Sequence, residues 1–332
     1  MKDTASKKIK YCFIINPFAG KGKHADVFRN NIPDICEGAG VEYDICVTGH
    51  IGEAKEYIQR IAGERQGGEE IGFFACGGDG TLCETVNAVM SLDNREGIYV
   101  GIVPIGTGND FVRNFGAEEH FMNIEDQINA APYLVDLIKC NDMYSVNMVN
   151  IGFDCEVVSA TASFKRKPFI PSKFAYIAGL IATLIKKPGA KMKMSLDGGE
   201  AKDTELLLTT FAGGRYCGGG FYSNPKARLN DGKIDCIFVK NISRRRFVSL
   251  VGRYKAGTHL DDPKLEPILE NKKLERIDMI FDKETNISVD GELIRAGEVR
   301  MEIIRNGLGL LLPRGAVTEG LECVWEASEA RS

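Results

Sequence analysis

The sequence predicts an α/β protein that combines an N-terminal three-layer α/β domain with a C-terminal β-rich domain built as an antiparallel sandwich. The chain has 332 residues, which is more than one hydrophobic core usually serves. Short apolar runs alternate with segments of helical period as far as Val103, a pattern typical of a parallel sheet covered by helices. After about residue 134 the runs are rich in β-branched residues and separated by turns, which favours antiparallel strands.

Four strands, with helices between them, are expected in the first half. The strands are predicted at 9–15, 41–47, 71–76 and 98–103. After Gly52, apolar residues recur at helical spacing with charged residues between them, which predicts an amphipathic helix that covers the sheet. The apolar positions of this helix are Ala54, Ile58, Ile61 and Ala62.

The second half is expected to hold mostly antiparallel strands and one helix. The strands are predicted at 143–151, 191–196, 204–212, 233–239, 277–282 and 299–304. The helix is expected at about 172–187, because Pro171 precedes it and Pro188-Gly189 follows it. We therefore assign residues 1–134 to the α/β domain and 135–304 to the β-rich domain, and we expect 305–332 to return to the first domain.

The charge of the chain argues against a nucleic-acid partner. The formal net charge is −4 and the pI is near 5.8, whereas a nucleic-acid binder usually carries a basic domain. Two local basic clusters remain, Lys165–Lys167 with Lys173 and Arg244–Arg246 with Arg253. They could meet anionic lipid head groups in a transient contact with a membrane surface. Solvated loops and helix faces are the alternative.

The cysteines indicate a cytoplasmic protein, which the basic clusters could bring to the inner membrane surface as a peripheral protein. The ten cysteines are scattered and form no C-x-x-C pair, so we interpret them as buried thiols in a reducing cytosol. The polar first residues predict no signal peptide. The longest apolar stretch, Phe174–Ile185, is too short to span a bilayer. It packs in a core or, alternatively, lines an acyl channel or meets the bilayer.

Three predicted strands of the first half run directly into glycine-rich turns. These turns are 16–22 (NPFAGKG), 77–81 (GGDGT) and 104–110 (PIGTGND). The carboxyl ends of parallel strands share one edge of a sheet, and glycine lets backbone N–H groups approach a phosphate there. Neither G-x-x-x-x-G-K-[ST] nor G-x-G-x-x-G occurs, which disfavours a Walker ATPase and a dinucleotide dehydrogenase. The turns therefore predict a phosphate site of another kind.

The glycine turns carry a family resemblance. The run from Gly77 to Asn87 resembles the signature of the diacylglycerol kinase catalytic family, whose GGDGT core is shared with NAD kinases and phosphofructokinases. Further segments resemble other blocks of that family at 16–22, 104–113, 230–232 and 290–292. The resemblance implies an ATP-dependent lipid kinase that transfers the γ-phosphoryl group to a lipid hydroxyl, such as that of diacylglycerol to give phosphatidic acid.

The resemblance also implies which residues bind the nucleotide. The segment 48–54 matches the T-x-x-x-G-x-A pattern of the family and adds Thr48 to the three turns. The implied nucleotide-binding residues are Asn16, Pro17, Phe18, Ala19, Gly20, Thr48, Gly78, Asp79, Gly80, Thr81, Leu82, Cys83, Glu84 and Thr107. A structural alternative exists for two of them, since Thr81 can cap the following helix and Glu84 can complete a capping box.

Asp79 is the candidate ligand of the Mg²⁺ that accompanies ATP, directly or through water, and we count it as catalytic. An Asx turn is the structural alternative for its side chain. Lys21 and Arg113 are the nearest basic candidates for neutralising the phosphate oxygens during transfer, and whether they contact phosphate stays open.

Two further sites are implied in the second half. Glu292 follows a plausible hairpin turn between strands 286–289 and 298–305, and the resemblance makes it the catalytic base for the substrate hydroxyl. The resemblance also implies a structural Mg²⁺ held by Asp231 and by the backbone carbonyls of Arg228 and Lys233, since this cation prefers hard oxygen ligands. We expect the active site in a cleft between the two domains.

Two alternatives to a lipid kinase remain. An NAD kinase shares the GGDGT turn, but Gly106–Phe111 has the diacylglycerol kinase form of the second block. A non-catalytic lipid- or nucleotide-binding regulator is the other, although Asp79, Asp231 and Glu292 are all retained. The acceptor lipid and the oligomeric state, including a homodimer, are left open.

Overall fold

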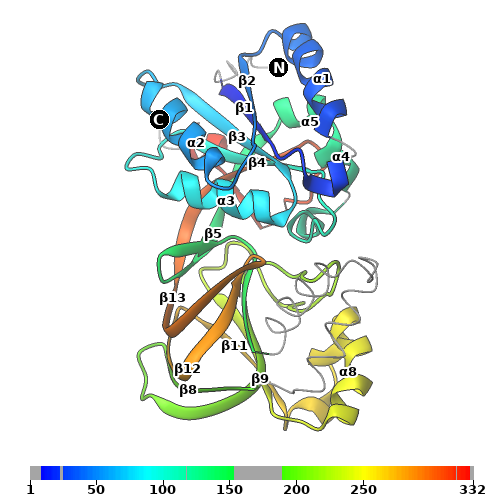
Figure 1. Ribbon diagram of the computed structural model, residues 1–332, viewed down its shortest axis with the longest axis vertical. Coiled ribbons are helices and arrows are strands. Elements are labelled where there is room, and N and C mark those ends of the chain that lie inside the picture. The colour runs from blue at the N-terminus through cyan, green and yellow to red at the C-terminus, as the bar shows by residue number, and fades with distance from the viewer. Residues whose placement is uncertain (1–8, 23–24, 117, 153–188, 319, 330–332) are drawn as a thin grey trace. The chain divides into compact units, whose positions relative to one another are not determined.

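The computed structural model describes residues 9–22, 25–116, 118–152, 189–318 and 320–329, together with all helices and strands named below. The chain divides into two compact units (Figure 1). The terminal unit comprises Met1–Val135 and Asn306–Ser332, and the middle unit comprises Asp136–Arg305. The helix predicted at 172–187, the apolar stretch 174–185 and the basic residues at 165–173 lie outside the described residues.

The terminal unit is built on a parallel sheet. Its strands are β1 (Ile9–Ile15), β2 (Tyr43–Val47), β3 (Glu70–Gly77) and β4 (Ile98–Pro104), in the spatial order β2-β1-β3-β4. The end of β13 (Glu292–Leu312) adds to β4 in parallel, with Gly309 opposite Tyr99. All four strands expected from the sequence are confirmed. Every residue of β3 and β4 is buried, as the central strands of a covered parallel sheet require, whereas the edge strand β2 is half-buried or exposed.

Helices cover this sheet. The long ones are α1 (Ala25–Ala39), α2 (Glu53–Glu64) and α3 (Asp79–Met90). The predicted amphipathic helix is confirmed as α2, which buries Ala54, Ile58 and Ile61 and packs against α3. The short elements of this unit are η1 (Ala19–Gly22), η2 (Phe111–Phe115), α4 (Glu118–Met122), α5 (Ile124–Ile128), β14 (Glu322–Cys323) and α9 (Val324–Glu329).

The middle unit is antiparallel β structure. Its strands are the end of β5 (Ala131–Cys140), β6 (Met143–Ser145), β7 (Met148–Gly152), β8 (Ala190–Leu196), β9 (Lys202–Ala212), β10 (Ile234–Lys240), β11 (Leu269–Leu274), β12 (Arg276–Val289) and most of β13. Strands β7 and β8 each pair with both β9 and β12, so these four strands close on themselves. Alternate residues of the strands point into one core around Phe211 and Phe238.

Two features of the middle unit correct the sequence-based expectation. The single strand predicted at 143–151 is interrupted between β6 and β7, because backbone N–H groups there turn to a buried carboxylate, described below. The helix α8 (Arg244–Ala256) was not predicted, although Ser243 caps its first turn and Gly257 ends it in the left-handed conformation. Two 3₁₀ turns follow it, η3 (Thr258–Leu260) and η4 (Pro263–Leu265).

Within the described residues, no helix has both the length and the apolar character needed to cross a membrane.

Candidate nucleotide and acceptor sites

The three glycine-rich turns of the terminal unit touch one another through their backbones. They follow β1, β3 and β4 at the carboxyl edge of the sheet. Gly20 has a φ of 57°, and a Cβ there would lie 2.4 Å from the carbonyl oxygen of Ile105. A Cβ on Gly106 would lie 2.4 Å from the Cα of Gly78. The backbone N–H of Gly106 also donates to the carbonyl of Gly77 at 3.0 Å. These glycines are therefore required by contact between the turns, a reason that the sequence did not reveal.

Asn16 joins the first turn to the second. Its Nδ2 donates to Oγ1 of Thr81 at 3.1 Å, and its Oδ1 accepts the backbone N–H of Phe18 at 3.0 Å. The backbone N–H of Asn16 donates to the carbonyl of Cys76 at the end of β3. One side chain thus fixes the path of its own turn and the position of the first turn of α3.

Asp79 joins the second turn to the third. Its two carboxylate oxygens accept the backbone N–H groups of Asp110 and Phe111, each at 3.2 Å. The local Asx turn weighed from the sequence is therefore wrong, because the partners lie more than thirty residues away. Asp79 is half-buried, and a carboxylate has about four lone-pair positions, so it keeps acceptor capacity for a metal ion or its water shell.

Glu84 and Thr48 join the turn after β2 to this cluster. Oε1 of Glu84 accepts the backbone N–H of Gly52 at 2.8 Å, and Gly52 is the N-cap residue that directly precedes α2. Oγ1 of Thr48 donates to the carbonyl of Ile15 at 3.4 Å. The capping-box alternative for Thr81 and Glu84 is wrong, since Gly78 begins α3 without a side-chain hydrogen bond.

The remaining implied nucleotide residues differ in exposure. Leu82 and Cys83 are buried in the packing of α3. Pro17 and Ala19 are half-buried, whereas Gly80 and Thr107 are exposed, and the Phe18 ring is 75% exposed.

The two basic candidates for phosphate contact, Lys21 and Arg113, differ in their contacts. Lys21 is exposed with a φ of 65°. Arg113 donates to the carbonyl of Gly108 at 3.2 Å and lies 3.5 Å from a carboxylate oxygen of Asp110. Arg113 therefore stabilises the third turn through contacts with two of its residues.

Glu292 lies in the middle unit, at the first position of β13. The hairpin predicted there is confirmed, since Val289 pairs with Glu292 across a two-residue turn. Asp290 and Gly291 have φ values of 48° and 94°, which suits the Asp-Gly sequence. The Glu292 residue is exposed and holds its position through the strand rather than through its own side chain.

Asp290 is a residue whose importance the sequence analysis missed. Its buried carboxylate accepts the hydroxyl of Ser145 at 2.6 Å and the backbone N–H groups of Val146, Asn147 and Met148 at 2.8 to 3.1 Å. Burial raises the pKa of the Asp290 carboxyl to about 6, while these hydrogen bonds act in the opposite direction. The Asp290-Gly291 turn that presents Glu292 is thus tied to the loop between β6 and β7. Only the Asp-Gly dipeptide signalled this turn, and nothing local signalled the burial.

The residues proposed for a structural cation also lie in the middle unit. The Asp231 carboxylate pairs with the ammonium of Lys273, and its other oxygen accepts the backbone N–H of Lys233 at 3.1 Å. The loop is further held by Asp136, which accepts the backbone N–H of Gly232 at 2.7 Å. The Asp231 carboxylate thus already holds a cationic group, which a Mg²⁺ ion at this oxygen would have to displace. Among the described residues, no group of three or more His, Cys, Asp or Glu side chains could hold a metal.

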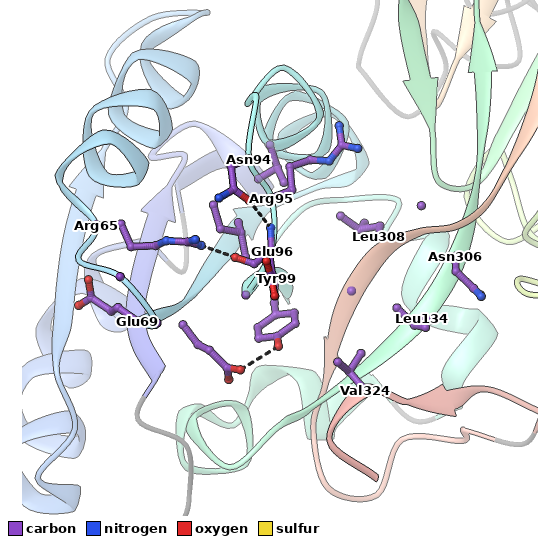
Figure 2. Close-up of a pocket in the computed structure, with 18 residues that line it drawn as sticks. Arg65, Glu69, Asn94, Arg95, Glu96, Tyr99, Leu134, Asn306, Leu308 and Val324 are labelled. Atoms are coloured by element: carbon purple, nitrogen blue, oxygen red, sulfur yellow. Dashed lines mark hydrogen bonds between the residues drawn. The ribbon is translucent and has the colours of Figure 1, made fainter. Parts of the chain in front are cut away.

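A cavity lies at the opposite edge of the sheet in the terminal unit. It encloses about 820 Å³ beside the starts of β3 and β4 (Figure 2). The Tyr99 hydroxyl donates to the buried Glu70 carboxylate at 3.2 Å, and Arg65 donates to the carbonyl of Glu96. None of the implied nucleotide residues lines this cavity. We therefore place the candidate nucleotide site at the glycine turns.

Comparison with known proteins finds two family models along the chain. Residues 10–140 match the diacylglycerol kinase catalytic domain, and residues 147–312 match the YegS C-terminal NAD kinase beta sandwich-like domain. A YegS-like protein of Alcanivorax borkumensis, named as a probable lipid kinase, is 27% identical over 89% of this chain and 95% of its own length. A proposed lipid kinase of Staphylococcus aureus strain JH9 is 27% identical over 78% of this chain and 83% of its own.

A solved structure supports the fold. The crystal structure of a proposed diacylglycerol kinase from Bacillus anthracis superposes with a TM-score of 0.73 at 24% identity. The superposition covers 96% of this chain and all of the other. The α/β domain followed by a β-rich domain is therefore the architecture that this chain adopts.

Proposed function

Because the chain belongs to the diacylglycerol kinase catalytic domain family, we propose that it is an ATP-dependent lipid kinase. In this proposal the γ-phosphoryl group of ATP passes to a lipid hydroxyl, with diacylglycerol as the first candidate acceptor and phosphatidic acid as the product. The names of the relatives support a lipid as the acceptor. The enzyme would then work at the inner membrane surface, where such a lipid lies.

The observation that carries the proposal is the N-terminus of α3, which lies among the three turns and has no side-chain cap. Gly78 begins this helix without a side-chain acceptor for the N–H groups of its first turn. Such N–H groups and the positive end of the helix dipole bind phosphate well. The first and third turns approach Gly78 and Asp79 on either side, through Asn16, Thr81 and Gly106. A nucleotide phosphate at this edge would meet backbone donors that are held in place before it binds.

Asp79 is the residue that we propose for the Mg²⁺ that accompanies ATP, since its carboxylate keeps lone pairs that the third turn does not use. When bound, this ion neutralises charge on the transferring phosphate. The chain itself keeps the third turn in register with the second through the same carboxylate. Lys21 is exposed next to Gly20 and is the basic side chain that we propose for phosphate contact, whereas Arg113 contacts Gly108 and Asp110.

Glu292 is the proposed base that accepts the proton of the lipid hydroxyl. Its carboxylate is exposed, and the buried Asp290 holds the turn that presents it. Asp231, with the carbonyls of Arg228 and Lys233, is the proposed structural Mg²⁺ site, in competition with Lys273. This ion would tie the loop 228–233 to the start of β10.

Incubation of the purified chain with labelled ATP, Mg²⁺ and a total lipid extract tests the proposal. We expect label in a lipid product that is absent when Glu292→Gln replaces the wild type. A parallel reaction offers NAD as the acceptor, and labelled NADP there would make the chain an NAD kinase instead. If ATP binds but neither acceptor is labelled, the chain is a nucleotide-binding regulator and the proposal is wrong.

A further inference from the structure

The helix α8 concentrates positive charge on a chain whose net charge is −4. Its thirteen residues, Arg244–Ala256, include four arginines, one lysine and no acidic residue. None of the residues 245–256 is buried; these positions are half-buried or exposed along the helix. The helix therefore lies on the surface of the middle unit and carries a local excess of positive charge.

One face of α8 fixes the helix to the middle unit. Phe247 and Leu250 pack against an apolar cluster formed by β9, β10 and the residues that follow them. Val251 and Tyr254 are half-buried and continue the same face, at the three- and four-residue spacing of a helix. The orientation of the opposite face is set by this packing.

The opposite face of α8 carries exposed small residues and cations. Arg245, Ser249, Gly252 and Ala256 are exposed and fall on one line of the helix. Exposed residues on its flanks include Arg246, Lys255 and Val248, whose side chain is 57% exposed. Small residues along the outermost line allow the helix backbone to approach a flat surface closely.

Most of this charge is unpaired within the part of the chain that the structure describes. Arg253 pairs with Asp262. Arg246 reaches only the carbonyl of Lys264, at 3.5 Å, and the Lys255 ammonium lies 5.7 Å from the centre of the Phe221 ring. No described carboxylate forms an ion pair with Arg245, Arg246 or Lys255.

The charge also stands at the end of the helix that least favours it. Arg244, Arg245 and Arg246 occupy the first turn, where the helix dipole is positive and cations destabilise the helix. Ser243 is the one stabilising cap at that end. An anionic partner would offset the repulsion between these arginines and the positive end of the helix dipole. This position therefore favours a contact between the arginines and an anion outside the chain.

We propose that the outward face of α8 docks on the surface of an anionic lipid bilayer. Arg245, Arg246 and Lys255 meet head-group phosphates, and Val248 enters the interface beside them. Small exposed residues between cations suit a flat bilayer, and the negative charge of the whole chain disfavours a nucleic acid. This surface goes beyond the proposed kinase site and does not depend on it, because docking requires no catalysis.

Sedimentation of the full chain with vesicles tests the docking. We expect binding to vesicles of phosphatidylcholine with about a third phosphatidylglycerol, little binding to phosphatidylcholine alone, and weaker binding at high salt. The test variant carries Arg245→Glu, Arg246→Glu and Lys255→Glu. Its control carries Lys193→Glu, Lys202→Glu and Lys283→Glu, three exposed lysines of the same unit with the same change in net charge.

We expect the test variant to lose at least about tenfold in vesicle affinity while the control stays within about threefold of the wild type. Thermal unfolding shows whether each variant is folded, and the milder pair Arg245→Gln with Lys255→Gln gives a second measurement if the triple variant is not. Equal losses in test and control would reduce the effect to net charge and overturn the proposal. It is also overturned if anionic vesicles do not bind the wild type, even when lipid phosphorylation is active.

Discussion

Glu84 in α3 accepts the backbone N–H of Gly52, the N-cap residue of α2, at 2.8 Å. The contact joins two helices and the turn that carries Thr48. Glu84→Ala removes the acceptor, and we expect ATP binding to weaken about tenfold and the melting temperature to fall by a few degrees. Glu84→Gln keeps an acceptor oxygen and should lose much less. Isothermal titration with ATP on both variants measures this, with Glu56→Ala on the exposed side of α2 as the control. If both substitutions at Glu84 behave like the control, the contact does not support the site.

Asp79→Asn is expected to reduce phosphoryl transfer by at least about a hundredfold, because the amide is a poor ligand for Mg²⁺. It also weakens the link to Asp110 and Phe111, so the free energy of unfolding should fall by about 1 kcal/mol. Asp93→Asn changes an exposed carboxylate of the same unit and should leave both quantities unchanged. Kinetics and urea unfolding of the three proteins separate the catalytic loss from the structural one. Wild-type turnover in Asp79→Asn would remove this residue from the catalytic site.

Glu292→Gln tests the proposed base. The substitution keeps the size of the side chain but removes the proton acceptor, so turnover should fall by roughly 10² to 10⁴-fold. ATP affinity should barely change, since the nucleotide turns belong to the terminal unit. Glu298→Gln, an exposed position on the same strand, is the matched control. Turnover within about threefold of the wild type would show that Glu292 is only a hairpin residue.

Asp290 gives the middle unit a pH-dependent stability. Its pKa is raised from 3.8 to about 6 in the folded chain, so the protonated form is favoured by folding. This contribution to the free energy of unfolding is fully present below about pH 4 and is lost as the pH rises through about 6, for a total of up to about 3 kcal/mol. Asp290→Asn cannot titrate, so the wild type should lose more stability than the variant between pH 4.5 and 7.5, values chosen roughly on either side of the raised pKa. Urea unfolding at both pH values measures the difference. Parallel pH profiles for the two proteins would contradict the raised pKa.

Lys273 and Mg²⁺ are expected to compete for Asp231. Mg²⁺ should raise the melting temperature of the wild type through binding to the folded state, and Lys273→Met should enlarge that shift. Asp231→Ala should abolish it. Lys272→Met removes a neighbouring charge that pairs with Glu270 instead and serves as the control. A Mg²⁺ response that is the same in all four proteins would exclude a cation site at Asp231.

The elements of the fold follow from local patterns, whereas the contacts of the site mostly do not. Four apolar runs and the spacing of Ala54, Ile58 and Ile61 were sufficient to predict the sheet of the terminal unit and α2. The strand predicted at 143–151 was too long because the carboxylate that interrupts it comes from Asp290, far along the chain. No local rule can supply such a partner.

The same limit applies within the site. The sequence indicated that Asp79 and Glu84 belong to the nucleotide site. The local structural explanation was an Asx turn for Asp79 and a capping box for Glu84. Their actual partners, at Asp110 and Gly52, lie about thirty residues away and depend on the order of the strands. The helix α8 was missed for a different reason. Its apolar face has only four residues, and the arginines make the segment too polar overall for the helical spacing of that face to stand out.

The pairing of β4 with the end of β13 has a consequence for biosynthesis. Tyr99 and Val100 in β4 pair with Gly309 and Leu310, and Leu311 fills the core of the same unit. All of residues 136–305 must leave the ribosome before that partner strand is available. Until then the first 135 residues carry an open strand edge, which is a template for pairing with other chains. A nascent chain that stalls before β13 should therefore depend on chaperones, and truncation upstream of Asn306 should yield an insoluble terminal unit rather than a working fragment.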